Sequence, residues 1–385
     1  MEARSAEPET VLRGHSGEIT AAAFAWKNAA GLPTLLSGAS NGEVRLWSLQ
    51  TFRPLATLDA HKGSSCLAVR TLANSRILTQ GRDGAVRIWD ASEGIRSAPL
   101  LELPSECYNF CQCACSESLV GFSSALTDET YYGGSRNGGG DDVPCDASSA
   151  APATATNLGE PPRGPAAPLM AMPDADAQQL QLWDLRQRSA ARTLAPLESH
   201  GKAGMCMCAR FAASDAMLLS GWEDGSLHSF DLRGGAGAAT ARKLHSEPLL
   251  CLDVDGTGAH VLTGSADCKL VVTPLLAGGE PGEPVGQLQV PVTNKASGSG
   301  GLASICNRPD GKIFAAGGWD RRVRIWQWKR FKPLAVLQHH TGTVNTVCFS
   351  PCSHWLASAS SDSTIALWKL FPPKGESSRG RASES

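Results

Sequence analysis

The sequence has no strong excess of charge and no long apolar run. Its 35 lysines and arginines nearly balance its 37 aspartates and glutamates, which leaves a formal net charge of −2. Such a balance gives no strong electrostatic attraction to nucleic acid or to a membrane surface. No apolar run reaches the roughly 18 residues that a membrane-spanning helix needs. The composition therefore predicts a protein that binds neither nucleic acid nor membrane.

The sequence also lacks several local signals that would assign a compartment or a reaction. The first nine residues are acidic and have no apolar core, unlike a secretory signal. We therefore expect a protein of the cytoplasm, the nucleus or both. There is no phosphate-binding P-loop and no convincing set of metal ligands. We expect a protein that is not an enzyme and that holds no metal or other cofactor.

Thirteen cysteines raise the question of zinc or disulfides. The densest group is Cys107, Cys111, Cys113 and Cys115, whose C-x3-C-x-C-x-C spacing differs from the paired C-x2-C of zinc sites. Three of these cysteines alternate like one face of a strand. Free cysteine is a common small buried hydrophobe, and without a secretion signal reduced thiols are expected. The pattern favours buried thiols over a zinc site.

One pattern recurs along the whole chain: a turn of small residues, an aspartate, five more residues and an aromatic. A histidine often precedes the aspartate, by 22 residues in His61/Asp83 and His340/Asp362 and by 24 in His200/Asp224. The Asp-to-aromatic step occurs as Asp83/Trp89, Asp224/Phe230, Asp320/Trp326 and Asp362/Trp368. Seven units can be counted, closing near Trp47, Trp89, Trp183, Phe230, Thr273, Trp326 and Trp368.

These units resemble WD40 repeats, in which each unit is one four-stranded blade of a β-propeller. Without its tails and a central insertion the chain gives about 44 residues per unit, within the range for such blades. The sequence thus predicts an all-β fold, a seven-bladed β-propeller. A closed ring leaves no long exposed sheet edges, and we expect Thr10–Arg13 to close it by adding the outer strand to the blade of Trp368.

The expected organisation is a single ring with flexible ends. We predict a flexible N-terminus over residues 1–9, the propeller over 10–371 and a disordered tail over 372–385. A disordered insertion at about 123–177 is predicted to interrupt the third blade, because its Gly, Ala, Pro, Ser and Asp content cannot bury enough apolar surface to fold. Strands are expected on either side of it, at 119–122 and 179–183.

Several stretches go beyond the generic repeat. They are Trp47-Ser-Leu-Gln-Thr51, Leu78-Thr-Gln-Gly-Arg-Asp83, Gly221-Trp-Glu-Asp-Gly225, and Ala316-Gly-Gly-Trp-Asp320 followed by Pro333-Leu-Ala-Val-Leu337. Together they resemble the G-protein beta-subunit-like protein 1 family, which is related to ASTRA-associated protein 1. The resemblance runs from about Val11 to Phe371, apart from the insertion.

The resemblance implies a non-enzymatic adaptor that is a monomer within a larger complex. Its implied partners are co-chaperones of the Tel2-Tti1-Tti2 type and the large phosphatidylinositol-3-kinase-related kinases that they help to mature or stabilise. It also implies links to DNA-damage signalling and to chromatin-associated assemblies.

Two other functions stay open. Trp183-Asp-Leu-Arg186 fits the W-D-x-R pattern of propellers that act as substrate receptors of cullin-4 ubiquitin ligases, and Phe230-Asp-Leu-Arg233 is a near match. Arg186 and Arg233 are therefore candidate contacts for a ligase adaptor. A heterotrimeric G-protein beta subunit is the other alternative. About ten residues precede the first strand, and they contain no heptads for a coiled coil with a gamma subunit.

Propeller folds host many functions, so the binding site has to be argued from particular residues. The residue before each turn aspartate should lie at the rim of one face of the ring. Arg82 and Trp319 are the strongest candidates because Arg and Trp are enriched at binding hot spots, and Trp222 is a weaker one. The full set of predicted protein-binding residues is Ser40, Arg82, Glu223, Trp319 and Ser361, with Glu18 and Thr343 near the starts of inner strands.

The residues that repeat from blade to blade are expected to hold the fold. Each histidine and aspartate should join through side-chain hydrogen bonds that fix a turn. A single His/Asp/Ser cluster would be consistent with a hydrolase triad, but recurrence in blade after blade favours scaffolding. The residues assigned to this structural role are His61, Asp83, Trp89, Asp224, Asp320, Trp326, His340, Asp362 and Trp368.

Overall fold

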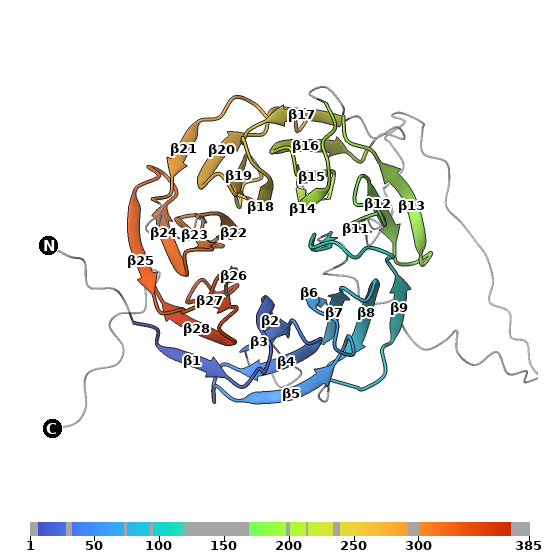
Figure 1. Cartoon of the computed structure of the whole chain (residues 1–385), viewed down its shortest axis with the longest axis vertical. Coiled ribbons are helices and arrows are strands. Elements are labelled where there is room, and N and C mark those ends of the chain that lie inside the picture. The colour runs from blue at the N-terminus through green and yellow to red at the C-terminus, as the bar shows by residue number, and fades with distance from the viewer. Residues whose placement is uncertain are drawn as a thin grey trace, which may run out of the picture.

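The computed structural model describes residues 7–27, 33–72, 75–92, 95–116, 119, 169–197, 201–212, 215–233, 239–291 and 300–370. These residues form seven four-stranded antiparallel sheets. Figure 1 shows them as the blades of a ring around a central axis. The predicted all-β, seven-bladed propeller is confirmed. The described residues include no helix long and apolar enough to cross a membrane.

Within each blade the strands run from the central axis to the rim in chain order. Blade 1 is β2 (Ile19–Lys27), β3 (Pro33–Ala39), β4 (Glu43–Ser48) and β5 (Pro54–Asp59). Blade 2 is β6 (Cys66–Leu72), β7 (Arg76–Gly81), β8 (Ala85–Asp90) and β9 (Leu101–Pro104). Blade 3 is β10 (Ala114–Cys115), β11 (Leu169–Pro173), β12 (Leu180–Asp184) and β13 (Ser189–Leu194). Blade 4 is β14 (Cys206–Ala212), β15 (Met217–Trp222), β16 (Ser226–Asp231) and β17 (Ala239–Lys243).

The remaining blades follow the same order until the last. Blade 5 is β18 (Leu249–Val254), β19 (His260–Ser265), β20 (Lys269–Pro274) and β21 (Gly286–Gln289). Blade 6 is β22 (Leu302–Asn307), β23 (Ile313–Gly318), β24 (Arg322–Gln327) and β25 (Pro333–Gln338). Blade 7 is β26 (Val344–Phe349), β27 (Trp355–Ser360), β28 (Thr364–Lys369) and, as its outer strand, β1 (Thr10–Arg13).

The N-terminal strand closes the ring. β1 pairs antiparallel with β28 in the register Thr10↔Leu367 to Arg13↔Thr364. The side chain of Leu12, in the middle of this strand, is buried in the core between blades 7 and 1. In Figure 1 the first and last strands accordingly lie side by side. Closure by Thr10–Arg13, as predicted from the sequence, gives blade 7 its fourth strand.

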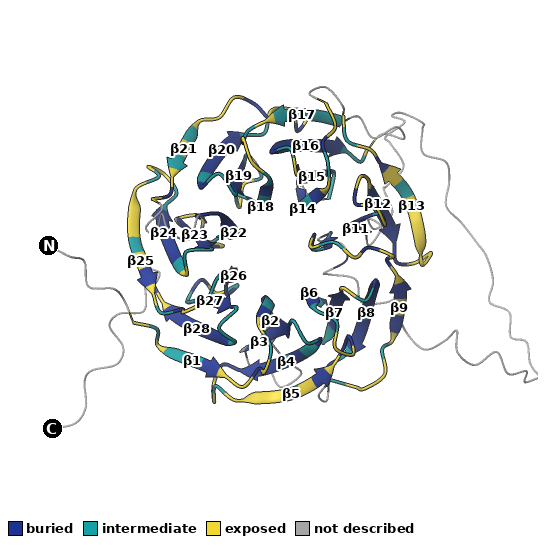
Figure 2. Cartoon of the chain, in the orientation of Figure 1, coloured by how far each residue is buried: buried dark blue, intermediate teal, exposed yellow. Residues whose placement is uncertain are grey.

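The core of the molecule is divided among the blade junctions. Seven clusters of buried side chains each join two neighbouring blades. Figure 2 shows the consequence: the middle strands are buried, while outer strands such as β5, β13 and β25 expose much of their length. Because each sheet is buried on both faces, its inner strands read as nearly continuous apolar runs rather than strict alternations.

The first strand of a blade also contacts the next blade through side-chain hydrogen bonds. These contacts lie near the start of the strand, where six inner strands have a register shift after their first paired residue. In blade 7 the Asn345 amide donates to the Ile19 carbonyl at 2.7 Å, and in blade 1 the Thr20 hydroxyl donates to the Cys66 carbonyl. Between blades 4 and 5 the Cys208 thiol contacts the Leu249 carbonyl at 3.5 Å.

The third blade differs from the sequence prediction at both edges of the insertion. The predicted insertion ends at 177, but Leu169–Pro173 already forms β11, and Ala177 is buried. The strand expected at 119–122 is wrong at Leu119, which lies in no strand; its amide donates to the Ser116 carbonyl at 3.1 Å. The inner strand is Ala114–Cys115 instead. Residues 120–168 and the tail 372–385 lie outside the described residues.

Candidate protein-binding surface

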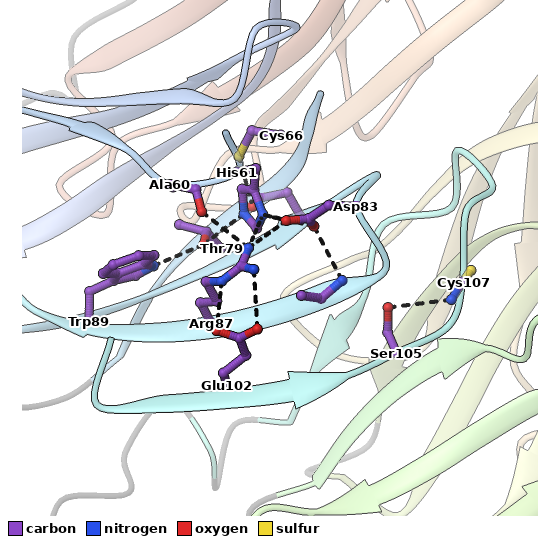
Figure 3. Close-up of polar contacts among 12 residues, drawn as sticks. Ala60, His61, Cys66, Thr79, Asp83, Arg87, Trp89, Glu102, Ser105 and Cys107 are labelled. Atoms are coloured by element: carbon purple, nitrogen blue, oxygen red, sulfur yellow. Dashed lines mark hydrogen bonds and ion pairs between the residues drawn. The ribbon is translucent and has the colours of Figure 1, made fainter. Parts of the chain in front are cut away.

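The recurring His, Asp and Trp form a hydrogen-bonded chain inside a blade. In blade 2, His61 Nδ1 lies 3.0 Å from Asp83 Oδ1, and His61 Nε2 lies 2.9 Å from Thr79 Oγ1. The Trp89 indole donates to that same Thr79 oxygen at 2.9 Å. Figure 3 shows this chain running from the turn into the core, with Arg87 beside it. The chain ties the turn to the aromatic residue that closes the strand.

The electrostatics of this chain point to a fixed structural role. Burial lowers the pKa of His61 below its ordinary value, against the opposing effect of Asp83. Burial alone would raise the pKa of Asp83, but hydrogen bonds from Arg87 and the contact with His61 outweigh it and hold that pKa low. At neutral pH the pair is a neutral imidazole and a carboxylate. Arg87, which also binds Glu102, completes the network on the outer side.

The same chain is complete in blade 7 and altered in the other blades that carry the repeat. In blade 7, His340 Nδ1 lies 2.9 Å from Asp362 Oδ2, and both His340 Nε2 and the Trp368 indole bind the Ser358 hydroxyl. Blade 5 keeps His245 with Asp267, but Thr273 replaces the aromatic residue. Blade 5 therefore keeps the bonded turn and lacks the aromatic end of the chain.

In blades 4 and 6 the described partners of the turn aspartate are a serine and an arginine. Asp224 accepts hydrogen bonds from the Ser226 amide and hydroxyl, and His200 lies outside the described residues. Asp320 instead pairs with Arg324, at 3.0 Å between Oδ1 and Nη1, and both side chains are nearly buried. In blade 6 the Trp326 ring stacks on Phe314 at a centroid distance of 5.3 Å.

The predicted rim residues occupy one face of the ring, which we call the turn face. It carries the turns between the second and third strands of each blade and the connections between blades. Each rim amide donates to the residue that precedes the inner strand of its own blade: Ser40 to Glu18, Arg82 to Ser65, Glu223 to Met205, Ala266 to Pro248, Trp319 to Gly301 and Ser361 to Thr343. The backbone thus fixes these positions and leaves their side chains to vary.

The rim side chains differ in how far they are exposed. Arg82, Glu223 and Glu18 are exposed, whereas Trp319 is half-buried. The indole of Trp319 lies against Gly301, where an added Cβ would meet its ring at 2.7 Å. The remaining predicted contacts, Ser40, Ser361 and Thr343, are also half-buried.

The structure does not bring the two strongest candidates together. Arg82 belongs to the turn between β7 and β8, and Trp319 to the turn between β23 and β24, on the other side of the ring in Figure 1. The weaker candidate Trp222 is wrong as a surface contact. Its side chain is fully buried in the core between blades 3 and 4, and its indole donates to the Ser220 hydroxyl at 2.8 Å.

Sequence reasoning missed the exposed aromatic residues of this face. Tyr108 and Phe110, 57% and 66% exposed, lie in the connection from blade 2 to blade 3. The Arg82 guanidinium carbon lies 4.5 Å from the centre of the Phe110 ring, and the Arg82 Nε donates to the Tyr108 carbonyl at 3.2 Å. A signal was present in the sequence, since two aromatics occur there between cysteines that are expected to be buried.

The cysteines around this connection are free thiols. Cys107, Cys111 and Cys113 are buried, and Cys111 Sγ lies 3.9 Å from Cys206 Sγ. Burial raises the pKa of Cys107 to about 11 and that of Cys206 well above its ordinary value, so both thiols remain protonated at neutral pH. Among the described residues, no three His, Cys, Asp or Glu side chains form a group that could hold a metal ion.

The two arginines of the W-D-x-R pattern lie on the opposite face. Both follow the third strand of a blade, Arg186 in blade 3 and Arg233 in blade 4, and strand direction places those turns away from the turn face. Each pairs with the aspartate two residues before it, Arg186 with Asp184 at 2.9 Å and Arg233 with Asp231 at 2.7 Å. Their side chains are 42% and 54% exposed.

The closed ring, its blade-by-blade hydrogen-bonded turns and its exposed rim define a WD-repeat propeller. The model of the family described as WD domain, G-beta repeat matches residues 6–48, 52–90, 291–327 and 331–369. The guanine nucleotide-binding protein subunit beta-like protein 1 of Mus musculus is 30% identical over 95% of this chain and 96% of its own length. The chain belongs to this family of beta-like proteins.

Fungal relatives extend the comparison to a second protein name. The ASTRA-associated protein 1 of Verticillium alfalfae is 27% identical, over 94% of this chain and 93% of its own. The protein of the same name from Schizosaccharomyces pombe is 25% identical, over 94% of this chain and 99% of its own. These matches cover nearly the whole propeller. They agree with the family resemblance predicted from the sequence.

Proposed function

We propose that this protein is a non-catalytic adaptor of the cytoplasm and nucleus that works with co-chaperones of the Tel2-Tti1-Tti2 type. In this role it helps large phosphatidylinositol-3-kinase-related kinases to mature or remain stable, and so supports DNA-damage signalling. It acts as a monomer within a larger, chromatin-associated assembly. The observation that carries the proposal is the near full-length match to relatives named for association with ASTRA.

The geometry supports binding rather than catalysis. The histidines and aspartates are bonded to one another in the turns, and this pairing recurs in several blades. The variable side chains lie above these turns on an exposed face. A rigid scaffold with a variable rim is suited to present a fixed surface to other proteins.

Affinity purification from cells, followed by mass spectrometry, tests the partner assignment. The tagged full chain should recover subunits of the Tel2-Tti1-Tti2 type and their client kinases. Depletion of the protein should lower the steady-state level of those kinases without lowering their messenger RNA, and re-expression of the full chain should restore them. Unchanged kinase levels together with no recovery of these co-chaperones would overturn the proposal. Imaging of the tagged protein outside both the cytoplasm and the nucleus would overturn the localisation.

A second candidate function is supported by the opposite face. Arg186 and Arg233 lie on adjacent blades in matching turns, each oriented by its own aspartate, which is the arrangement expected of a repeated contact. In this alternative the protein is a substrate receptor of a cullin-4 ubiquitin ligase. The double variant Arg186→Ala with Arg233→Ala should then lose the ligase adaptor. Equal adaptor binding by this variant and the unaltered protein would eliminate the alternative.

A further inference from the structure

We propose that the turn face recognises a short segment of a partner protein in which an acidic side chain stands next to a large apolar side chain. The site is the patch formed by Arg82, Tyr108, Phe110 and Met205, hereafter the aromatic patch. The inference rests on the proposed function as a protein-binding adaptor and assigns its docking site.

The aromatic patch spans three blades. Arg82 comes from the turn of blade 2, Tyr108 and Phe110 from the connection into blade 3, and Met205 from the residue just before β14 of blade 4. Asn109 joins these parts, because its side-chain amide donates to the carbonyl of Cys206 at 3.2 Å. The connection into blade 3 is therefore bonded to the turn of blade 2 on one side and to the start of β14 on the other.

The connection that carries the two aromatics is held in place by a buried side chain of blade 2. The fully buried Gln80 binds it twice: its amide donates to the Cys111 carbonyl at 3.0 Å, and its oxygen accepts from the Cys113 amide at 2.6 Å. The Asn109 side-chain oxygen accepts from the Cys111 amide at 3.1 Å. These bonds fix the backbone on both sides of Phe110.

The outer end of the connection is fixed as well. The Ser105 amide donates to the Gly84 carbonyl at 2.7 Å, which folds the chain back over the turn of blade 2. The Tyr108 ring then covers Gly84, where an added Cβ would lie about 3.0 Å from it. Gly84 has a φ of +76°, a conformation that favours glycine. The aromatic side chains are thus presented on a rigid support.

Exposure of these side chains is not explained by the packing of the fold. Cys107, Cys111 and Cys113 on the same connection are buried, while Tyr108 and Phe110 between them face solvent. Met205 is a third exposed apolar side chain, at 42%. Rigid aromatics lose little conformational entropy on binding and are enriched at hot spots. A preorganised aromatic pair beside a methionine suits an apolar anchor on the partner.

Charge supplies the second half of the specificity. Among the described residues, the Arg82 guanidinium has no ion-pair partner; its contacts are the Tyr108 carbonyl and the Phe110 ring. By contrast, Arg87 in the same blade is paired with Asp83 and Glu102. An unpaired guanidinium held above an apolar surface favours a carboxylate that docks beside the anchor. The partner segment therefore combines an acidic residue with a large apolar one.

Selection from a random peptide library displayed on phage tests this inference with the purified full chain as bait. Enriched peptides should share an acidic residue within one or two positions of Phe, Leu, Met or Trp. Binding of the synthetic peptides, followed by fluorescence anisotropy, should weaken by about tenfold or more for Phe110→Ser and for Arg82→Ala. The charge reversal Arg82→Glu should favour peptides in which lysine replaces the acidic residue. Leu55→Ser, which alters an exposed apolar residue on the outer strand of blade 1, is the matched control and should bind like the unaltered protein.

Several results would overturn the inference. One is the enrichment of peptides without an acidic residue, and another is equal peptide binding by Phe110→Ser and the unaltered protein. A third is self-association of the unaltered chain in sedimentation that is absent in Phe110→Ser. The last result would assign the aromatic patch to a second copy of this protein. Peptide binding with the predicted pattern, without recovery of co-chaperones from cells, would support the site and contradict the proposed function. If Phe110→Ser recovers co-chaperones from cells as well as the unaltered protein does, the proposed function is supported and the aromatic patch is contradicted as its docking site.

Discussion

His61 Nδ1 lies 3.0 Å from Asp83 Oδ1, and these two residues, 22 positions apart, fasten the loop that enters blade 2 to the turn between its second and third strands. Because the aspartate is ionised and its partner is buried, removal of the carboxylate takes the acidic partner away from both His61 Nδ1 and Arg87, while His61 Nε2 keeps its contact with Thr79. Asp83→Ala should therefore lower the free energy of unfolding by on the order of 1–3 kcal/mol. Denaturant unfolding monitored by tryptophan fluorescence measures the change.

The equivalent aspartate of blade 7 provides a replicate, and an exposed one provides a control. Asp362→Ala should destabilise the protein by a similar amount, since His340 and Thr364 both bind this carboxylate. Asp176, an exposed residue in the turn of blade 3, should tolerate replacement by alanine. If Asp83→Ala and Asp362→Ala unfold no more easily than Asp176→Ala, the structural role assigned to these residues is wrong.

Ring closure by β1 should dominate the stability of the chain. Deletion of residues 1–13 removes all four register pairs with β28 and exposes that strand as a free edge. We expect a marked loss of thermal stability and a tendency to aggregate, measured by a melting curve and light scattering. Leu12→Ala alone should cost about 2–4 kcal/mol, because the side chain is buried in the core between blades 7 and 1.

A nearby ion pair on the surface provides a control for the effect of charge on stability. Glu9 and Lys369 form an exposed ion pair at 3.0 Å between the same two segments. Exposed pairs contribute little to stability, so Glu9→Gln should leave the melting temperature nearly unchanged. A deletion of 1–13 that melts like Glu9→Gln would show that β1 does not close the ring.

Blade 5 offers a stabilising substitution. Thr273 replaces the aromatic residue of the repeat, and its fully buried hydroxyl has no hydrogen-bond partner among the described residues. Thr273→Val should therefore be neutral or stabilising, by up to about 1 kcal/mol. Thr263→Val is the matched control in the same blade, because the Thr263 hydroxyl binds His245 at 2.9 Å and its loss should destabilise. Destabilisation of equal size by both variants would contradict this account of blade 5.

Stability should fall as the pH drops from about 6.5 toward 4. Burial lowers the pKa of His15 to about 4; Glu43 opposes this shift, and the charge of Arg45 adds to it. The unfolded chain, with an ordinary histidine pKa near 6.5, then binds more protons than the folded chain in this window, so folding is disfavoured as protons become available. For His15 the loss between pH 7.5 and 5 is on the order of 2 kcal/mol. Burial also lowers the pKa values of His61 and His245, so these residues act in the same direction.

Urea unfolding at pH 7.5 and pH 5.0 checks this prediction. His15→Gln should be less stable than the unaltered protein at pH 7.5, because the bond to Ser37 is weakened. The difference in the free energy of unfolding between pH 7.5 and pH 5.0 should also be smaller for His15→Gln than for the unaltered protein. An unchanged pH dependence in His15→Gln would mean that His15 is not a source of the acid sensitivity.

The repeat in the sequence was sufficient to predict the ring, because each blade contains the same local signals. The strands of Trp89 and Trp368, the turns of Asp83 and Asp362 and the closing strand at Thr10–Arg13 all follow from short-range pattern. β11 was missed because Leu169–Pro173 directly follows an Ala- and Pro-rich stretch, and its pairing with β12 depends on contacts that local composition does not show.

The candidate site was less accessible to sequence reasoning. The prediction that Arg82 lies at an exposed rim follows from its place in the turn. Its pairing with Phe110 depends on a connection that folds back through Gln80 and Gly84, residues that belong to other strands and turns. The distance around the ring between Arg82 and Trp319 is likewise a property of the closed propeller. Turn spacing along the chain does not reveal which rim residues become neighbours.

The central claim is that this propeller binds its partners through the turn face, and a comparison of the two faces tests it most directly. Tagged forms of the unaltered chain, Arg82→Ala with Trp319→Ala, and Arg186→Ala with Arg233→Ala would be purified from cells, and co-chaperone and kinase recovery measured by quantitative mass spectrometry. Matching melting temperatures would show that each form is folded. We predict reduced recovery for the first double variant and unchanged recovery for the second. Unchanged recovery for Arg82→Ala with Trp319→Ala, or loss confined to Arg186→Ala with Arg233→Ala, would contradict the account.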